Sequence, residues 1–326
     1  MRLRFLFLIT AFIVSGALLP LKASAATESS ILASVLPENP APNENTTITL
    51  SSYANNLDSV LISWSVNGQK SFSGIGKKSF SVNAPAAGSE MSVIAAVSLP
   101  EGAIDIETII RPAVTVLLWQ ANDSYVPPFY RGKAMPMPES EVKVVAMPEI
   151  KSGSQTVDPK NMVYAWRKDY SNDQEASGYG KDNFIFFNDY LDSSNNISVT
   201  ASTVDQKYSS NANIEVGTTQ PKVVFYRHDA DLGTIWEQAL ANGHKILGDT
   251  IIEAAPYFMS PKNLQVPLLT WNWFINDSPV NISGFRENLM PVTVEAGVSG
   301  TSKIKLEIAN SVKLFGKAGK EISVEF

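Results

Sequence analysis

Hydrophobic and polar residues alternate with a period of two along much of the chain. In residues 60–66 and 93–97, apolar side chains occupy every second position. Successive side chains of a β-strand point to opposite faces of its sheet, so this pattern predicts strands that are buried on at least one face.

Clusters of turn-forming residues separate these alternating segments. Residues 37–45 are rich in proline and asparagine, and residues 192–196 contain only aspartate, serine and asparagine. Short alternating strands divided by such turns are typical of antiparallel sandwiches. We therefore expect an all-β fold.

A glycine-containing motif occurs three times. The run from Ser73 to Phe80 recurs from Ser177 to Phe184 and, more weakly, from Ser283 to Leu289. The copies lie roughly one hundred residues apart, which is the size of a whole domain. A phosphate-binding loop would need a different glycine and lysine order before a helix, so these glycines predict a tight turn between strands. The chain is therefore predicted to be an array of three duplicated domains.

Each copy of the motif follows a tryptophan in a strand-like run. The three residues are Trp64, Trp166 and Trp271, and a further shared run follows each motif at 92–95, 198–201 and 293–296. An apolar or aromatic residue lies two positions before each tryptophan, on the same strand face, which favours burial of the indole in a structural core. The alternative is an exposed ring that stacks on a sugar.

The repeats divide the chain into predicted units and connectors. We expect a signal peptide at 1–25, immunoglobulin-like domains at 26–119, 140–226 and 248–326, and connectors at 120–139 and 227–247. The last residues, 322–326, alternate like a final sandwich strand, although a further unit cut short is an alternative.

The first predicted connector carries prolines and aromatic residues. Prolines favour an extended course. In the second connector, Thr234 and Glu237 form a capping-box pattern, which predicts a short helix near residues 235–242. The aromatic side chains of the connectors either pack against neighbouring domains or form a partner-contact surface: Trp119, Tyr125, Phe129, Tyr130 and Trp236.

The first 25 residues have the order of a secretory signal peptide. Arg2 and Arg4 precede an apolar run, and the small residues Ala23 to Ala25 form a cleavage site. The run is short for a membrane span and is interrupted by Gly16 and Pro20, so cleavage is favoured over a retained anchor. We expect an exported protein at the cell surface, outside the cell or in the periplasm, with no later transmembrane segment.

The charge balance argues against nucleic-acid partners. The formal net charge is −6, and removal of residues 1–25 takes away Arg2, Arg4 and Lys22 but no acidic residue. Binding to a phosphate backbone depends largely on lysine and arginine, so an acidic chain is poorly suited to it.

Composition also limits the chemistry. The chain has no cysteine and only two histidines, which excludes disulfides, thiolate nucleophiles and cysteine-ligated metals. His228 to Asp231 is a candidate metal cluster, but a solvated loop is favoured. Residues 169–173 and 188–192 offer oxygen ligands for calcium without the spacing of a known calcium loop. No catalytic motif organises the carboxylates, so we expect no enzyme, no cofactor and no resident metal.

Several runs in the first unit resemble a known class of domain. Residues 40–45, the strand up to Tyr53, the strand and turn at 62–68, and the motif at 74–80 are similar to the Ig-like or PKD-like domains of uncharacterised exported proteins from bacteria with reduced genomes. The resemblance is most specific over residues 30–120. It implies an immunoglobulin-like sandwich and a cell-surface or periplasmic setting, and it implies no catalytic residues.

These observations favour a non-catalytic role in binding or spacing other molecules. The expected partner is an envelope protein or a surface-appendage protein. The alternative is a carbohydrate-binding module of the cell envelope whose partner is a surface glycan.

Overall fold

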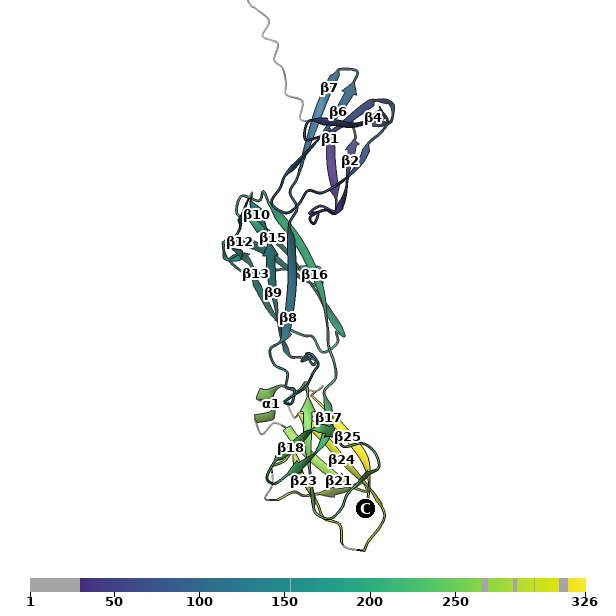
Figure 1. Ribbon diagram of the computed structural model, residues 1–326, viewed down its shortest axis with the longest axis vertical. Coiled ribbons are helices and arrows are strands. Elements are labelled where there is room, and N and C mark those ends of the chain that lie inside the picture. The colour runs from purple at the N-terminus through teal and green to yellow at the C-terminus, as the bar shows by residue number, and fades with distance from the viewer. Residues whose placement is uncertain (1–29, 153, 266–268, 284–285, 296, 311–315) are drawn as a thin grey trace, which may run out of the picture.

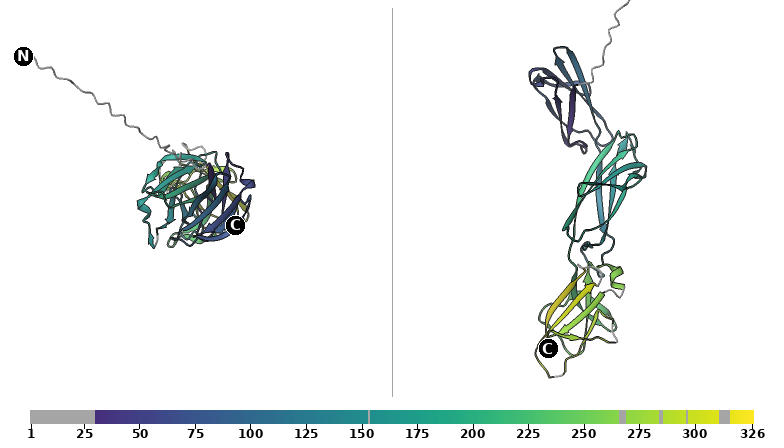
Figure 2. Two further views of the ribbon diagram at one scale, coloured as in Figure 1. Left: turned by 90° about the horizontal axis from the view of Figure 1, so that it is seen from above. Right: turned by 180° about the vertical axis from the view of Figure 1, so that it is seen from behind.

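A computed structural model describes residues 30–326 except 153, 266–268, 284–285, 296 and 311–315. The predicted signal peptide lies outside the described residues. The chain forms three β-sandwiches stacked end to end into an elongated rod (Figures 1 and 2).

The first sandwich contains seven strands in two sheets. The sheets have the strand orders β1-β2-β5 and β4-β3-β6-β7, and every pairing is antiparallel. The strands are β1 (Ile31–Leu36), β2 (Asn45–Ser52), β3 (Leu61–Val66), β4 (Gln69–Ile75), β5 (Ser79–Asn83), β6 (Met91–Leu99) and β7 (Gly102–Ile110).

The second sandwich repeats this plan. Its sheets have the orders β14-β9-β8 and β13-β12-β15-β16, and a small hairpin of β10 and β11 is added. The strands are β8 (Val114–Ala121), β9 (Glu141–Glu149), β10 (Lys151–Ser152), β11 (Gln155–Thr156), β12 (Met162–Lys168), β13 (Ser171–Tyr179), β14 (Asn183–Phe187), β15 (Ser194–Thr203) and β16 (Ser209–Gly217).

The third sandwich extends the plan at two sheet edges. Its sheets have the orders β18-β17-β20-β23 and β19-β25-β24-β21-β22, in which only the short pairing of β19 with β25 is parallel. The elements are β17 (Lys222–Asp229), β18 (Gly233–Ala239), β19 (His244–Lys245), β20 (Thr250–Tyr257), α1 (Pro261–Gln265), β21 (Leu269–Ile275), β22 (Ser278–Val280), β23 (Leu289–Val292), β24 (Thr301–Asn310) and β25 (Ala318–Glu325).

The expected all-β array of three immunoglobulin-like antiparallel sandwiches is therefore confirmed. The final predicted strand is part of β25, which pairs with β24 along its length and belongs to the third sandwich. In the described part of the chain, no helix has the length and apolar character needed to cross a membrane.

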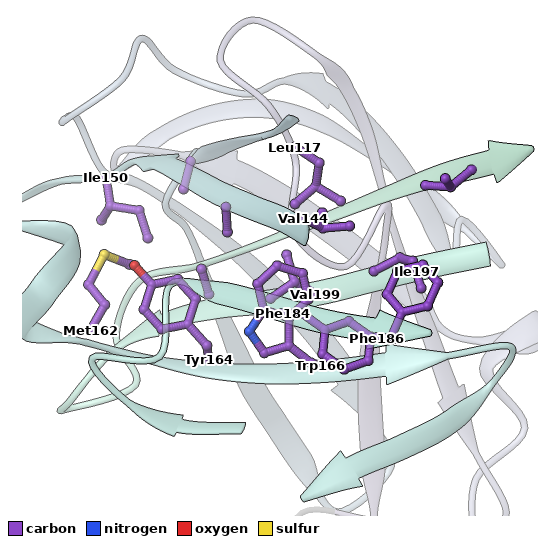
Figure 3. Packing of buried hydrophobic residues seen from close by; sticks show 14 of the residues in the cluster. Leu117, Val144, Ile150, Met162, Tyr164, Trp166, Phe184, Phe186, Ile197 and Val199 are labelled. Atoms are coloured by element: carbon purple, nitrogen blue, oxygen red, sulfur yellow. The ribbon is translucent and has the colours of Figure 1, made fainter. Parts of the chain in front are cut away.

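A buried tryptophan anchors each core by the same hydrogen bond. The indole Nε1 atoms donate over 2.9 Å to backbone carbonyls in the turn of the repeated motif: Trp64 to Lys77, Trp166 to Lys181 and Trp273 to Glu287. Figure 3 shows the second core, where Trp166 lies beside Phe184 with ring centroids 5.8 Å apart. The motif recurs because its turn carries the acceptor for this indole, and an unpaired buried donor would be costly.

The glycines of the motif do form the expected turn. Gly76 and Gly180 have φ angles of 68° and 70°, in the left-handed region. A Cβ atom on Gly76 would lie 2.8 Å from the carbonyl oxygen of Asp58. Close approach of two backbone segments therefore requires glycine at this position.

The prediction for the third core tryptophan was wrong by two residues. Trp273 is buried, whereas Trp271 is only partly buried at the edge of the core. Both residues lie on the same face of β21, so alternation could not separate them, and depth within the sandwich decides which one is enclosed. The run at 293–296 was also misaligned, since β24 is the strand that pairs with β21.

Both predicted connectors belong to sandwiches. β8 starts at Val114 and pairs with β9, so the first domain ends near Ile110 and residues 122–140 form a loop inside the second sandwich. The segment 227–247 contains the end of β17 together with β18 and β19 of the third sandwich. The covalent links between the sandwiches are therefore the short segments 111–113 and 218–221.

The predicted helix at 235–242 is a strand. β18 pairs with β17, and α1 is the only α-helix in the part of the chain that the structure describes. An isolated two-turn helix is marginal in water, because its nucleation is costly. Pairing with β17 at Gly233, Thr234 and Ala239 holds β18 at the edge of the sheet. Trp236 lies against Tyr226 there, with ring centroids 5.0 Å apart.

Candidate binding site at the joint of the second and third sandwiches

The loop 122–140 reaches from the second sandwich to the third. The Tyr125 amide donates to the Met259 carbonyl over 2.7 Å, and the Phe258 amide donates to the Tyr125 carbonyl over 2.6 Å. The Ser260 hydroxyl donates to the Asp123 carboxylate. This loop therefore joins the two sandwiches through backbone pairing as well as side chains. Figure 1 shows the course of the chain between the two sandwiches.

Aromatic rings fill the same joint. Tyr130 packs edge-on against Tyr257 and Phe258, with centroid distances of 5.4 and 6.0 Å. The hydroxyls of Tyr226 and Tyr257 are hydrogen-bonded over 2.5 Å. Burial, followed by the hydrogen bond to Tyr226, raises the pKa of Tyr257 well above its usual range. Tyr257 is therefore neutral at physiological pH.

The five predicted contact residues do not form one surface. Tyr125 and Tyr130 lie in the joint, and Trp236 packs on Tyr226 in the third sandwich. Trp119 packs against the second core, and the Lys133 ammonium lies 3.2 Å from its ring centroid. Burial lowers the pKa of Lys133. Phe129 alone projects freely, with 84% of its surface exposed.

A hollow opens where the loop meets the third sandwich. Its volume is about 410 Å³, and it is lined on several sides by different elements. The lining includes Tyr125 from the loop, Glu253 from β20, Leu264 from α1, Trp271 from β21, and Arg286 and Asn288 from the segment before β23. A second hollow of about 490 Å³ shares Trp271 and Glu287 with the first.

Trp271 forms a wall common to both hollows. Unlike the three anchoring tryptophans, it donates no indole hydrogen bond to any residue that the structure describes. Arg286 is exposed beside it, and Asn288 adds an amide. An aromatic wall with a few converging polar groups is suited to binding a peptide or a sugar.

A buried carboxylate supports the floor of the first hollow. Glu253 Oε2 accepts from the Thr234 hydroxyl and lies 2.8 Å from His228 Nδ1, while Oε1 accepts from the Asn288 amide over 3.2 Å. Burial, and then the charge of Glu253, raises the pKa of Tyr125. Both oxygens of Glu253 are engaged in hydrogen bonds, and one of these bonds positions the Asn288 side chain at the hollow.

His228 lies in a strand, which corrects the expectation of a solvated loop. It is part of β17 and is mostly enclosed beside Glu253. Within the described residues, no three histidine, aspartate or glutamate side chains are grouped so as to hold a metal ion.

The acidic loops that offered calcium ligands use their carboxylates locally. The Asp169 carboxylate accepts a hydrogen bond from the backbone N–H of Asn196, and the Asp173 carboxylate accepts one from the backbone N–H of Ala176, each over 2.8 Å. Asp189 accepts from the Leu191 amide over 2.9 Å. These hydrogen bonds hold turns in shape.

No motif in the sequence indicated the hollow. Its lining comes from residues 125, 253–256, 264, 271 and 286–288, which no local pattern connects. The only available signal was the pair Trp271 and Trp273 on one strand face, since a single core position cannot enclose both rings.

Comparisons with known proteins identify no family. No protein-family model matches the chain, and no curated protein matches its sequence. Among solved structures, the three N-terminal domains of the bacteriophage RB49 highly immunogenic outer capsid protein are similar, with 10% identity and a TM-score of 0.26, over 90% of this chain and 97% of that one.

Two further similar structures are bacterial. The fibronectin(III)-like modules of CbhA from Clostridium thermocellum share 13% identity, with a TM-score of 0.28, over 58% of this chain and 95% of that one. SGBP-B of the Bacteroides ovatus mixed-linkage glucan utilization locus, in complex with a heptasaccharide, shares 13% identity, with a TM-score of 0.22, over 88% of this chain and 64% of that one. Likenesses this low carry no information on what the chain binds.

Proposed function

We propose that this protein is an exported, non-catalytic rod that holds a binding site at a set distance from its N-terminal end, at the cell surface or in the periplasm. The observation that carries the proposal is the bonded joint between the second and third sandwiches. Tandem domains on short linkers usually move relative to one another unless their interface is extensive. Here the loop 122–140 adds backbone hydrogen bonds and ring contacts to a short covalent link.

The joint between the first and second sandwiches supports the same interpretation. Glu90 of the first accepts from the Tyr208 hydroxyl of the second over 2.7 Å, and Arg111 in the link pairs with Glu90 over 3.0 Å. The Arg111 guanidinium also lies over the Tyr208 ring, 5.8 Å from its centroid. Polar contacts at both joints restrict bending of the rod.

The proposed partner is an envelope or appendage protein that inserts a side chain into the hollow beside Trp271. Arg286 suits an acidic group of such a partner. The test is co-purification of cross-linked partners from envelope fractions with the wild-type protein and with Arg286→Glu. We expect Arg286→Glu to lose a specific cross-linked partner that the wild type captures. The control Lys70→Glu, on the first sandwich, should still capture that partner. Equal capture by both variants would contradict the proposed site.

The second candidate ligand is a surface glycan. The feature favouring it is the ring of Trp271 beside the amide of Asn288, since sugars stack on aromatic faces and hydrogen-bond to planar polar groups. Calorimetry against envelope polysaccharide with wild type, Trp271→Ala and the control Trp236→Ala tests it. Heat of binding that only Trp271→Ala abolishes is expected, and no binding by wild type would rule out this candidate.

A further inference from the structure

The outer face of the sheet β14-β9-β8 in the second sandwich is apolar and uncovered. Five large side chains on it are between 45% and 63% exposed: Val116, Leu118, Met147, Ile185 and Phe187. Val116, Leu118 and Met147 lie together, because Val116 pairs with Met147 and Leu118 pairs with Val145. Ile185 and Phe187 lie on the other side of β9, where they pair with Lys143 and Glu141. Together the five side chains expose roughly 500 Å² of apolar surface, which is near the upper end of what a monomer usually shows in one patch.

The fold does not require an apolar surface there. In the corresponding sheet of the first sandwich, β2 and β5 present a ladder of hydroxyls, in which Thr47 bonds to Ser81 over 2.9 Å and Thr49 to Ser79 over 3.1 Å. The exposed leucines of that face, Leu32 and Leu36, lie on its edge strand β1. The middle strand of the face is thus polar in the first sandwich and carries Val145 and Met147 in the second. Selective apolar exposure indicates a surface that another molecule covers.

The charges along β9 indicate which molecule covers it. The outward residues of β9 are, in order, Glu141, Lys143, Val145, Met147 and Glu149. When the strand is reversed about Ala146, Glu149 meets Lys143, a residue of opposite charge. Val145 and Met147 lie at the centre. The face is therefore complementary to a reversed copy of itself.

A two-fold axis in the plane of the interface and perpendicular to the strands produces this arrangement. It places β8 and β9 each over its own copy with the direction reversed, as isologous interfaces require. β14 pairs only with residues 141–145 of β9, so it lies to one side of the axis. Lys143 then faces Glu149 of the second copy, and Val116 faces Leu118 of the second copy, because Leu117 pairs with Ala146 at the centre. Two sheets can pack face to face in this way at about 10 Å.

We propose that the protein forms a two-fold dimer through this face of the second sandwich, with the two rods running in opposite directions. Both copies together would bury at most about 1,000 Å², which is below the usual size of specific interfaces. The dimer is therefore weak and reversible, with a dissociation constant of about 1 to 100 µM. It does not depend on the hollow beside Trp271.

Sedimentation velocity of the mature chain over a range of concentrations tests the dimer. Wild type is expected to pass from monomer to dimer as its concentration rises. Leu118→Lys should remain monomeric, and Leu32→Lys, at an exposed leucine of the first sandwich, should dimerise as wild type does. Circular dichroism shows whether each variant is folded. A wild-type chain that stays monomeric up to about 1 mM would overturn the proposal.

A charge exchange tests the antiparallel arrangement. Glu149→Lys should weaken dimerisation about tenfold or more, because it creates two repulsive contacts per dimer. The double variant Lys143→Glu with Glu149→Lys should restore it. Within one chain these residues lie six positions apart on a strand, about 20 Å, so they do not interact directly. Failure of the double variant to recover would overturn the arrangement, and rescue would establish contact between two copies.

Discussion

The indole Nε1 of Trp273 donates a 2.9 Å hydrogen bond to the backbone carbonyl of Glu287, and this bond has a counterpart in each of the other two sandwiches. It ties an inner strand of one sheet to the turn that leads into the other sheet. The Trp273 ring also stacks on Phe225 with centroids 5.5 Å apart. A hydrogen bond and a large apolar ring therefore act at the same point of the core.

Trp273→Phe should destabilise the third sandwich by about 2 to 4 kcal/mol, because it removes buried ring volume and leaves the Glu287 carbonyl without its donor. Trp271→Phe is the matched control on the same strand and should cost less than about 1 kcal/mol. Urea unfolding followed by fluorescence measures both. Equal destabilisation by the two variants would contradict the assignment of Trp273 as the anchor.

Gly76→Ala should destabilise the first sandwich by about 1 to 3 kcal/mol. The new Cβ would lie 2.8 Å from the Asp58 carbonyl oxygen, and φ is in the left-handed region. Gly68→Ala is the control, since Gly68 also has a positive φ but its new Cβ would meet no other part of the chain within 4 Å. Gly68→Ala should destabilise the sandwich less, by about 1 kcal/mol. The difference in thermal stability between Gly76→Ala and Gly68→Ala then measures the effect of the steric contact with Asp58.

Acidification should loosen the joint between the first and second sandwiches. Hydrogen bonds from Arg111 and Tyr208 lower the pKa of Glu90 below its ordinary value of 4.5. Because the pKa of Glu90 is lowered, its contact stabilises the joint fully above pH 4.5, and this stabilisation is lost as the pH falls through the lowered pKa. Small-angle scattering from about pH 6 down to about pH 3 should show growing flexibility of the rod, and Glu90→Gln should show it already at the higher pH. A rod of unchanged shape in Glu90→Gln would contradict the role of this contact.

Tyr130→Ala should uncouple the second and third sandwiches. The Tyr130 ring contacts Tyr257 and Phe258 across the joint, whereas the neighbouring Phe129 ring is largely in solvent. Phe129→Ala is therefore the control, with an effect on stability within about 0.5 kcal/mol. NMR relaxation should report more independent tumbling of the third sandwich in Tyr130→Ala only. The same tumbling in both variants would mean that the ring contacts do not stiffen the joint.

Local patterns in the sequence were sufficient to predict the all-β class, the number of units and the turn chemistry of the repeated motif. These patterns are a period of two, clusters of turn residues, and glycine where φ must be positive. The burial of Trp64 and Trp166 followed from their place in alternating runs.

The boundaries, the joints and the candidate sites depend instead on how the strands assemble. β18 has a capping-box pattern, yet pairing with β17 outweighs the weak propensity of a short helix. The loop 122–140 has the composition of a linker, but it lies between two paired strands and contacts both the second and the third sandwich. Local patterns describe the faces of one strand, whereas pairing, depth and contact between distant segments arise only in the assembled fold. That is why Trp273 is enclosed and Trp271, two residues earlier on the same face, is left at the wall of a hollow.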